Sequence, residues 1–374
     1  MSTAGGKVIP GLERVLAFES SIAYIDGAAP ELSVRGYAIE DVVAKMGYDE
    51  MAFLLWHERP PMAYELAAFR SDLASLRAVP GPVLDMLRAT PPSAHPMAAL
   101  RTAVSTLGHR DSDADDVSRK DNLRKAMSLT AMIPTIVAAQ VRIAGGQEPI
   151  APDPSLGHAA NYYYMIAGSP PDETMRRTLD ATLVLYAEHE TNASTFAARV
   201  VVSTLSDFYS AVVAGIGAIK GPLHGGAIEG AMEMFLKVGS PEKAAAYVDG
   251  ELAARRLLPG FGHRVYRAGD PRAGALREMA RDLGKAMGDE LWFDIAEACE
   301  KRMRDTKGII PNVDYFAAIV LHQLGIPLSL MTNVVASARI AGWSAHILEQ
   351  YANNRLIRPR ARYVGQRGLT LSGD

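Results

Sequence analysis

The sequence predicts a mainly α-helical fold. From Ile39 onward, apolar residues recur at three- and four-residue spacing in most segments, which is the period of an amphipathic helix. Signals for β-strands are nearly absent after that point, and the chain contains no internal repeat and no low-complexity segment. With 374 residues, the chain is long enough to bury a large core and to form two lobes.

The first half of the chain is expected to begin with a short β element and to continue as helices. Residues 16–37 alternate modestly in polarity and contain Asp26-Gly27, which predicts a small hairpin. Apolar spacing interrupted by Pro or Gly then predicts helices over residues 39–56, 62–76, 82–89 and 97–107. A longer helix is predicted over residues 122–143, with Pro134 expected to kink or break it.

The second half contains further predicted helices, one of which has an unusual composition. Apolar spacing predicts helices over residues 173–190, 206–219, 271–288, 290–305, 314–324 and 330–350, and Ser240-Pro241-Glu242 starts another. Ser206 is expected to cap the helix that is rich in small residues, namely Ala211, Ala214, Gly215, Gly217 and Ala218. This composition fits either tight packing within one chain or a helix-on-helix dimer seam.

Composition and charge restrict the class of protein. The chain is 48% hydrophobic and 22% charged, as expected for a soluble globular protein. Its net charge of −3, without a lysine-rich tract, argues against nucleic acid and anionic membrane as partners. No apolar run approaches the ~20 residues of a membrane span, and the first ten residues lack a secretory signal. The single cysteine, Cys299, fits a reducing compartment, so we expect a cytoplasmic protein.

The stretch from Pro259 to Arg272 is the first candidate site. Two glycines just before His263 indicate a backbone that bends tightly to present an imidazole. Asp270 and Pro271 are typical of the N-cap and first residue of a helix. Arg272 then falls in the first turn, where the helix dipole disfavours a cation, so we expect an anion in front of it. The stretch lacks GxGxxG and therefore gives no support for a dinucleotide site.

Two more histidines stand in segments that break the amphipathic pattern. His189 is followed by Glu190, but Ala193 occupies the place of a second histidine, so the HExxH zinc motif fails. A lone histidine near a helix end is commonly a packed or capping residue. His224 lies between Gly-Pro and Gly-Gly, just before a helix through Val238, whose positive end would favour a neutral ring. The alternative is a glycine-rich turn with an incidental histidine.

Asp314, in the segment Ile310-Pro-Asn-Val-Asp, is the candidate carboxylate. It could be a plain helix N-cap, or it could be a general base whose pKa is raised by an apolar environment. The chain has no serine or cysteine nucleophile motif. Three histidines, one carboxylate and several arginines suit proton transfer beside a bound anion, with neutral histidines stabilising an oxyanion and arginines holding carboxylates.

Over nearly the whole chain, the sequence resembles the citrate synthase family. The segments that carry the resemblance, in order, are residues 189–194, 221–227, 260–272 and 311–314, followed by Ala338-Arg339 and Arg358-Pro-Arg360. The resemblance implies a two-domain helical fold, with a large domain from residues 1–225 and 326–374 and a small mobile domain from residues 226–325. It also implies condensation of an acyl-CoA with oxaloacetate, followed by thioester hydrolysis.

The resemblance assigns a role to each candidate residue. Asp314 would remove the acyl α-proton, His224 would stabilise the enolate, and His263 would polarise the oxaloacetate ketone. The residues that would hold the substrate carboxylates are His189, Arg272, Arg339 and Arg358, the last from the partner subunit of a homodimer. Those that would bind coenzyme A are Arg267, Asn312 and the backbone around Leu258 and Gly260. No metal and no cofactor is expected, because the coenzyme A thioester is a substrate.

Two departures from the family pattern bear on the acyl group. Ile228 stands where many relatives have Asn, and Val335 stands where an aromatic residue often packs beside the acyl group. A smaller side chain at 335 would widen the acyl pocket, so 2-methylcitrate synthase, which uses propionyl-CoA, is the alternative to citrate synthase. The run from Arg264 to Arg267 instead looks like relatives that use acetyl-CoA. A metal-dependent hydrolase and a non-catalytic helical dimer are the alternatives from other classes.

Overall fold

A small antiparallel sheet opens the fold in the computed structural model, which describes residues 8–13 and 15–370. Its strands are β1 (Ala23–Asp26), β2 (Glu31–Val34) and β3 (Tyr37–Ala38), in the order β1-β2-β3, with Ala23 opposite Val34. This confirms the predicted hairpin. In its turn, Oδ1 of Asp26 accepts hydrogen bonds from the backbone N–H groups of Ala28 and Ala29.

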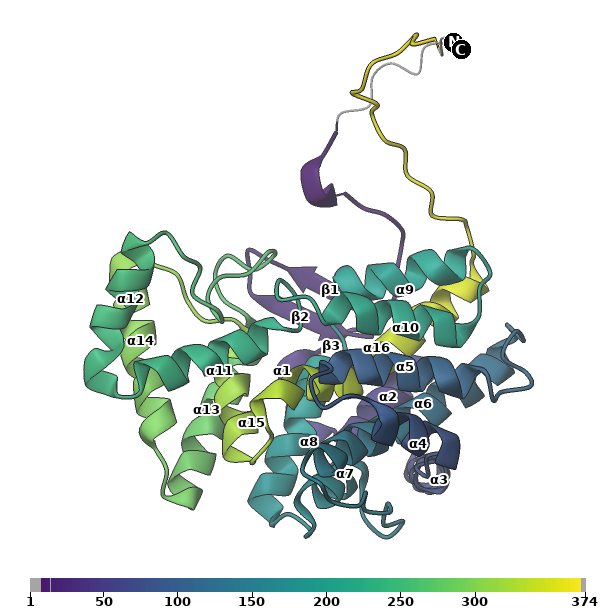
Figure 1. The fold of residues 1–374 in the computed structure, drawn as a ribbon, viewed down its shortest axis with the longest axis horizontal. Helices are drawn as coiled ribbons and strands as arrows, with labels where there is room; N and C mark the ends of the chain where they lie inside the picture. The colour runs from purple at the N-terminus through teal and green to yellow at the C-terminus, as the bar shows by residue number, and fades with distance from the viewer. Residues whose placement is uncertain (1–7, 14, 371–374) are drawn as a thin grey trace.

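Helices make up most of the remaining fold. Those of the first half are α1 (Ile39–Lys45), α2 (Tyr48–His57), α3 (Ala63–Ser75), α4 (Gly81–Ala89), α5 (Pro96–Gly108), α6 (Arg119–Ala144), α7 (His158–Ala167), α8 (Glu173–Ala187), α9 (Ala193–Ser203) and α10 (Phe208–Ile219). They surround the C-terminal helix α16 (Met331–Ala352), which contacts α2, α6, α8, α9 and α10 (Figure 1). Nearly every side chain of α16 is buried, so this helix is the centre of the core.

A second group of helices lies to one side of this assembly, on the left in Figure 1. Its members are α11 (Ala227–Val238), α12 (Ala244–Ala253), α13 (Pro271–Met287), α14 (Leu291–Lys307) and α15 (Val313–Gln323). Short 3-10 turns at Pro10–Leu12, Pro241–Lys243 and Leu328–Leu330 complete the helical elements within residues 8–13 and 15–370. The residue limits of a separate mobile domain stay a prediction.

Several helix boundaries differ from the predicted ones. The single helix predicted over residues 39–56 is two helices, because Gly47 starts α2 with its N–H donated to the Glu50 carboxylate. α6 continues through Pro134 without a break. α7 and α9 occupy segments for which no helix was predicted. Asp207, not Ser206, caps α10, and the segment after Ser240 is a 3-10 turn before α12.

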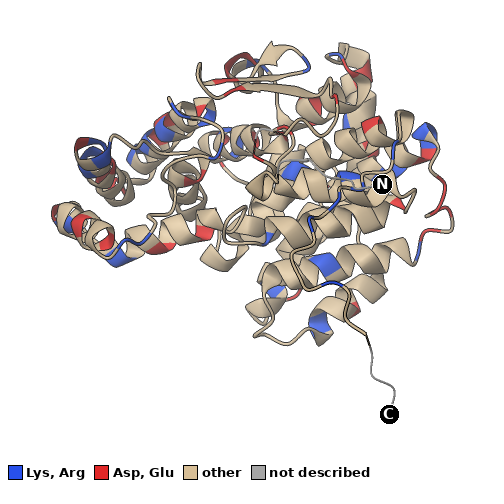
Figure 2. Ribbon diagram, turned by 90° about the horizontal axis from the view of Figure 1, so that it is seen from above, with Lys and Arg blue, Asp and Glu red and all other residues tan. Residues whose placement is uncertain are grey.

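α6 is also long and apolar enough to cross a membrane by length and composition, contrary to the expectation from the sequence. However, 67% of its most apolar window is buried inside the fold, so packing against other helices explains its composition. Figure 2 shows acidic and basic residues interspersed along the helices in that view. Such mixing fits the small net charge and gives no basic stripe for nucleic acid there.

Candidate active site

The four predicted segments each place their polar residue at a helix end or in a loop. His189 is the second residue after the end of α8, and His224 lies in the turn before α11. His263 lies in the loop between α12 and α13, and Asp314 is the second residue of α15. The bend predicted before His263 is present, because Gly260 and Gly262 have φ of +81° and +74°. A Cβ at Gly260 would lie 2.8 Å from the Tyr315 ring, so the backbone passes very close to α15.

His189 and His263 lie together with Tyr266. The imidazole ring centroids are 5.3 Å apart, and the His263 ring lies 4.6 Å from that of Tyr266. Nε2 of His189 is 3.2 Å from the hydroxyl oxygen of Tyr266. Burial, followed by the charge of Arg272, holds the pKa of His189 well below its usual value, so this ring is neutral.

The hydrogen bonds of His263 fix the position of its proton. Nδ1 accepts from the backbone N–H groups of Val265 at 3.0 Å and Tyr266 at 3.1 Å. An acceptor nitrogen carries no hydrogen in the neutral ring, so Nε2 is the donor. Burial, followed by the nearby Arg272, lowers the pKa of His263 to about 4. The site therefore presents a neutral N–H donor at this position.

In His224 the hydrogen bonds place the proton on the other ring nitrogen, Nδ1. Its Nε2 accepts from the backbone N–H of Ser194 at 3.3 Å and lies 2.8 Å from the Ser194 hydroxyl oxygen. Nδ1 is therefore the donor. Trp343 Nε1 donates to the same hydroxyl oxygen at 3.1 Å, which holds Ser194 in place. The pKa of His224 falls to about 4, and burial is the main cause, rather than the helix end proposed from the sequence.

Asp314 is not a helix N-cap. The cap of α15 is Asn312, whose side-chain oxygen accepts from the backbone N–H of Asp314 at 3.0 Å. The carboxylate of Asp314 is thus available for other contacts, and its Oδ1 accepts a hydrogen bond from the Tyr186 hydroxyl at 2.8 Å. Burial raises the pKa of Asp314 to about 6, against the lowering effects of Tyr186 and Arg272. A carboxylate of this kind is a stronger base than an exposed one and is still ionised at neutral pH.

Two buried arginines lie near these groups. Arg272 is 2% exposed and donates two hydrogen bonds to the carboxylate of Asp270. Arg339, on α16, donates from Nε to the carbonyl oxygen of Tyr186. Burial lowers the pKa of Arg339 to about 10, so it remains a cation at neutral pH. Two fixed cations in a buried site would attract a dianionic substrate.

Comparison with known proteins agrees with this geometry. The family model described as citrate synthase, C-terminal domain, matches residues 11–360. A protein named citrate synthase from Haloferax volcanii is 45% identical over 369 residues, which is 97% of each chain. The chain belongs to the citrate synthase family. A 2-methylcitrate synthase from Mycobacterium tuberculosis is 39% identical over 97% of this chain and 92% of that protein.

A solved citrate synthase also has this fold. The structure from Thermoplasma acidophilum, described as a ternary complex with carboxymethyl coenzyme A and oxaloacetate, aligns with a TM-score of 0.94 at 30% identity over 98% of both chains. Family membership also identifies the chain as an enzyme that transfers an acyl group in a condensation reaction. The fold prediction is thereby confirmed.

The residues assigned to coenzyme A lie on and beside the His263 loop. The Arg267 side chain is exposed, and its backbone N–H donates to the carbonyl oxygen of Gly27 at 2.9 Å. The Asn312 side-chain amide donates a hydrogen bond to the carbonyl oxygen of Gly262 at 2.8 Å. Leu258 and Gly260 are buried. Of these four residues, Arg267 is therefore the one with an exposed charged side chain. The coenzyme A roles of all four residues stay predictions.

Arg358 is the one candidate that the structure does not bring to the site. It is exposed on the segment that follows α16, and this segment extends away from the body of the protein beside the N-terminal segment (Figure 1). The neighbouring residue Ile357 donates its backbone N–H to Oγ of Ser203 at 3.0 Å, which is at the end of α9, whereas His189 precedes the start of α9. The role of Arg358 in the site of a second subunit stays a prediction.

Several functional residues could not be found from the sequence. Tyr186 lies in an apolar run of α8, the sequence marks Asp270 only as a helix cap, and Tyr266 has no distinguishing local pattern. No local pattern gives their partners. Among the described residues, no group of three or more His, Cys, Asp or Glu side chains is arranged to hold a metal ion.

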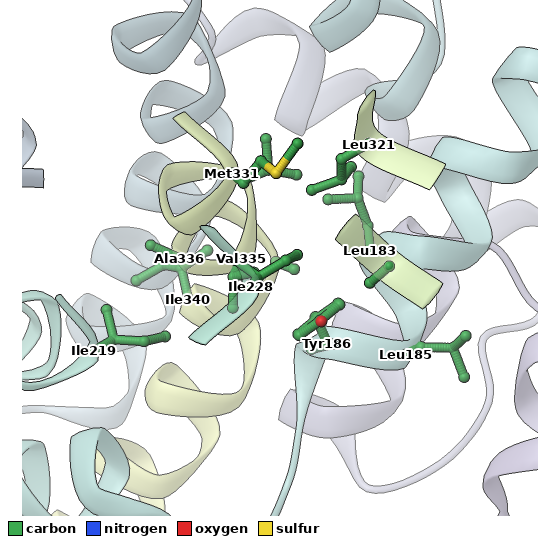
Figure 3. Close-up of a cluster of buried hydrophobic side chains, with 14 of the residues drawn as sticks. Leu183, Leu185, Tyr186, Ile219, Ile228, Leu321, Met331, Val335, Ala336 and Ile340 are labelled. Atoms are coloured by element: carbon green, nitrogen blue, oxygen red, sulfur yellow. The ribbon is translucent and has the colours of Figure 1, made fainter. Parts of the chain in front are cut away.

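An apolar cluster lies beneath the site. Figure 3 shows Tyr186 of α8 facing Ile228 of α11 and Val335 of α16, with Leu183 beside them. Ile228 and Val335 are 0% and 3% exposed. The two residues that depart from the family pattern thus meet in one buried cluster, next to the tyrosine that contacts Asp314.

Proposed function

We propose that the protein condenses acetyl-CoA with oxaloacetate and hydrolyses the resulting thioester to citrate and coenzyme A. The observation that carries the proposal is the set of proton positions in the site. One carboxylate of raised pKa accepts a proton, and two neutral imidazoles each present one N–H, from Nδ1 of His224 and from Nε2 of His263. A proton acceptor and two separate N–H donors are what enolate formation and attack on a ketone require.

The first step is removal of an α-proton from the acetyl group. Asp314 accepts the proton, and the electron pair moves onto the thioester oxygen to give an enolate. His224 donates its Nδ1–H to that oxygen, and a donor of this kind is worth about 3–4 kcal/mol by analogy with an oxyanion hole. Because both imidazoles have a pKa of about 4, they are neutral donors over the physiological range.

The second step is attack of the enolate carbon on the oxaloacetate ketone. His263 donates a hydrogen bond from its Nε2–H to the ketone oxygen and stabilises the alkoxide that forms with the carbon–carbon bond. The alkoxide then takes up one proton, which balances the proton that Asp314 removed from the acetyl group. Arg272 and Arg339 pair with the substrate carboxylates, and His189 supplies a further hydrogen bond from a neutral ring. Water then cleaves the thioester to give the free thiol of coenzyme A.

The side chains near the acyl group support a second candidate function. Val335 is small, and it packs with Ile228 beside Tyr186, so a methyl extension of the acetyl group could be accommodated by repacking this cluster. That supports 2-methylcitrate synthesis from propionyl-CoA as the alternative. One methylene group changes discrimination by only ~1–3 kcal/mol, so use of both thioesters is compatible with the site.

We also propose that the enzyme is a cytoplasmic homodimer. The small-residue helix α10 supports this, because Gly217 is exposed and a Cβ there would meet no atom within 4 Å. The extended segment after α16 supports it as well, with exposed apolar side chains at Leu356, Tyr363 and Val364. In a dimer, this segment would reach the second chain and place Arg358 in its oxaloacetate site.

The decisive experiment follows release of free thiol from acetyl-CoA and from propionyl-CoA in the presence of oxaloacetate. We expect release with acetyl-CoA that depends on oxaloacetate. The ratio of kcat/KM for the two thioesters separates the two functions. Absence of release with both thioesters, from a folded protein, would refute the proposal.

A further inference from the structure

Tyr186 and Asp314 form a hydrogen bond that joins two helices 128 residues apart in the sequence. The Tyr186 hydroxyl donates to Oδ1 of Asp314 at 2.8 Å. We propose that Tyr186 is the positioning residue of the general base: it holds Oδ1 and leaves Oδ2 as the oxygen that takes the α-proton. This inference rests on the proposed function for the identity of the proton.

Tyr186 is fixed at both ends, which suits a positioning role. It is 3% exposed and lies at the end of α8, with its ring in the apolar cluster of Figure 3. Its carbonyl oxygen accepts from Nε of Arg339. The phenol therefore has little freedom to rotate, and a rigid donor defines the orientation of the carboxylate that it contacts.

The phenol can act only as a donor to Asp314. Burial, followed by the charge of Asp314, holds the pKa of Tyr186 well above its usual value, so the hydroxyl stays protonated. A hydrogen bond from this hydroxyl favours the ionised carboxyl group, because the charged form is the better acceptor. It thus opposes the effect of burial, which raises the pKa of Asp314.

Other charges also face Asp314 from neighbouring helices. Arg272 on α13 and Arg339 on α16 favour its ionised form, whereas the carboxylate of Asp270 disfavours it. These groups act at a distance on the whole carboxyl group. Among residues 8–13 and 15–370, Tyr186 is the side chain that donates a hydrogen bond to one oxygen of Asp314, so it can distinguish Oδ1 from Oδ2.

The first test is Tyr186→Phe, which keeps the ring in the cluster and removes only the hydroxyl. We expect kcat to fall by about tenfold to a hundredfold at pH 7, because the general base is no longer held in its productive orientation. The acid limb of kcat/KM should move to higher pH by about one unit. The matched control is Tyr315→Phe. Tyr315 is next to Asp314 in the sequence, and its hydroxyl donates a buried hydrogen bond of 2.8 Å to the carbonyl oxygen of Ala296, which the substitution removes. The control should keep the wild-type pH profile.

A second test uses a substitution that keeps the shape of the side chain and should shift the acid limb in the opposite direction. Site-specific replacement of Tyr186 by 3,5-difluorotyrosine makes a stronger donor of nearly the same shape. The acid limb should then move to lower pH. An unchanged limb in both variants, or shifts in the same direction, would overturn the role of Tyr186.

A third measurement does not depend on turnover. Isotope-edited infrared spectroscopy can titrate the Asp314 carboxyl group in the folded protein and in both Tyr186 variants. We expect the midpoint to rise in Tyr186→Phe and to fall with the fluorinated residue. If the wild-type protein releases no thiol from either acyl-CoA, the proposed function fails, but this titration still decides whether Tyr186 controls Asp314.

Discussion

Arg272 donates from Nε and Nη2 to the two carboxylate oxygens of Asp270, at 2.9 and 2.8 Å, and both side chains are buried. Two of the three Arg272 nitrogens are therefore engaged by an anion of the chain itself, and the proposed contact of Arg272 with a substrate carboxylate stays a prediction. Asp270 also accepts from the backbone N–H groups of Arg272 and Val313, both at 3.1 Å. One carboxylate thus caps α13, fixes the Arg272 guanidinium by two hydrogen bonds, and holds the start of α15, which carries Asp314, beside it.

Asp270→Asn should be strongly destabilising. It leaves the buried Arg272 cation without its counter-charge, which costs about 3–5 kcal/mol of unfolding free energy, measured by chemical denaturation. The control is Asp249→Asn, because Asp249 pairs with Arg302 in the same two-bond geometry, at 2.8 Å for both bonds, but at the surface. We expect little change in the control. Equal losses in the two variants would contradict a special role for Asp270.

Asp314→Asn should abolish condensation while oxaloacetate still binds. Removing the general base should lower kcat by about a hundredfold to ten thousandfold. The carboxylate-binding cations Arg272 and Arg339 remain, so isothermal titration should give an unchanged oxaloacetate affinity. Asp305→Asn, which alters only an exposed pair with Lys301, is the control for kcat. Loss of oxaloacetate binding in a folded variant would count against Asp314 as the base.

The activity should fall on the acid side through pH 6. Asp314 has a pKa of about 6 and works as the ionised form, so log kcat/KM should rise with pH up to this value and then level off. His224 and His263, with pKa values of about 4, are already neutral donors at pH 6, so their ionisation does not change the pH profile near that value. A pH profile of kcat/KM from pH 4.5 to 8 checks this. A rate that is flat down to pH 4.5 would exclude Asp314 as the group that limits activity.

The same ionisations have opposite effects on folding. The raised pKa of Asp314 contributes stability below about pH 4, and this contribution is lost as the pH rises through 6. The lowered pKa values of the two histidines contribute stability above about pH 6.5, which is lost as the pH falls to 4. We therefore expect Asp314→Asn to be more acid-sensitive than the parent, since only the histidine effect remains. Denaturation at pH 7 and pH 4.5 measures the difference.

Gly27→Ala, a substitution in the hairpin turn, should lower activity by displacing the loop that carries His263. A Cβ at this position would lie 2.3 Å from the carbonyl oxygen of Val265, and Gly27 accepts the backbone N–H of Arg267. The variant must displace the loop that carries His263, so kcat/KM should fall by about tenfold or more, since a small misplacement costs that much. Gly250→Ala, in open space on α12, is the control and should keep its activity. Full activity of Gly27→Ala would show that the loop tolerates the shift.

Subunit mixing tests the proposed place of Arg358. Arg358→Ala and Asp314→Asn should each be nearly inactive alone, because each removes one part of every site. If Arg358 completes the site of the partner, a mixed dimer contains one intact site, and a 1:1 mixture after subunit exchange should recover about a quarter of the parental activity. If Arg358 acts within its own chain, mixing recovers nothing. Arg360→Ala in place of Arg358→Ala is the control for the tail.

The sequence was sufficient for elements that depend on local signals. The Asp270-Pro271 start of α13, the hairpin and the bend at Gly260 and Gly262 are present as predicted, because capping, turn formation and positive φ are properties of a few adjacent residues. Asn312 and Asp314 show the limit of this reasoning. Both are good capping residues in one short segment, and only the structure shows that Asn312 caps and Asp314 is left for chemistry.

Contacts between distant segments could not be predicted in this way. Tyr186 meets Asp314 across 128 residues, and Ser194 meets His224 across 30. Neither tyrosine nor serine is unusual where it stands in the sequence. The split between α1 and α2 has a distant contribution besides the local bond between Gly47 and Glu50. Oδ1 of Asp180, a residue of α8, accepts the backbone N–H of Tyr48 at 3.0 Å, and a Cβ at Gly47 would lie 2.8 Å from its Oδ2.

The single cysteine has a practical consequence for measuring this enzyme. Cys299 is fully buried on α14, and burial raises the pKa of its thiol to about 12. Disulfide reagents that report free coenzyme A react with thiolates, and this side chain supplies almost none at the pH of an assay. The colour that develops therefore counts product alone, and a slow rise in its baseline would signal unfolding of α14 rather than turnover.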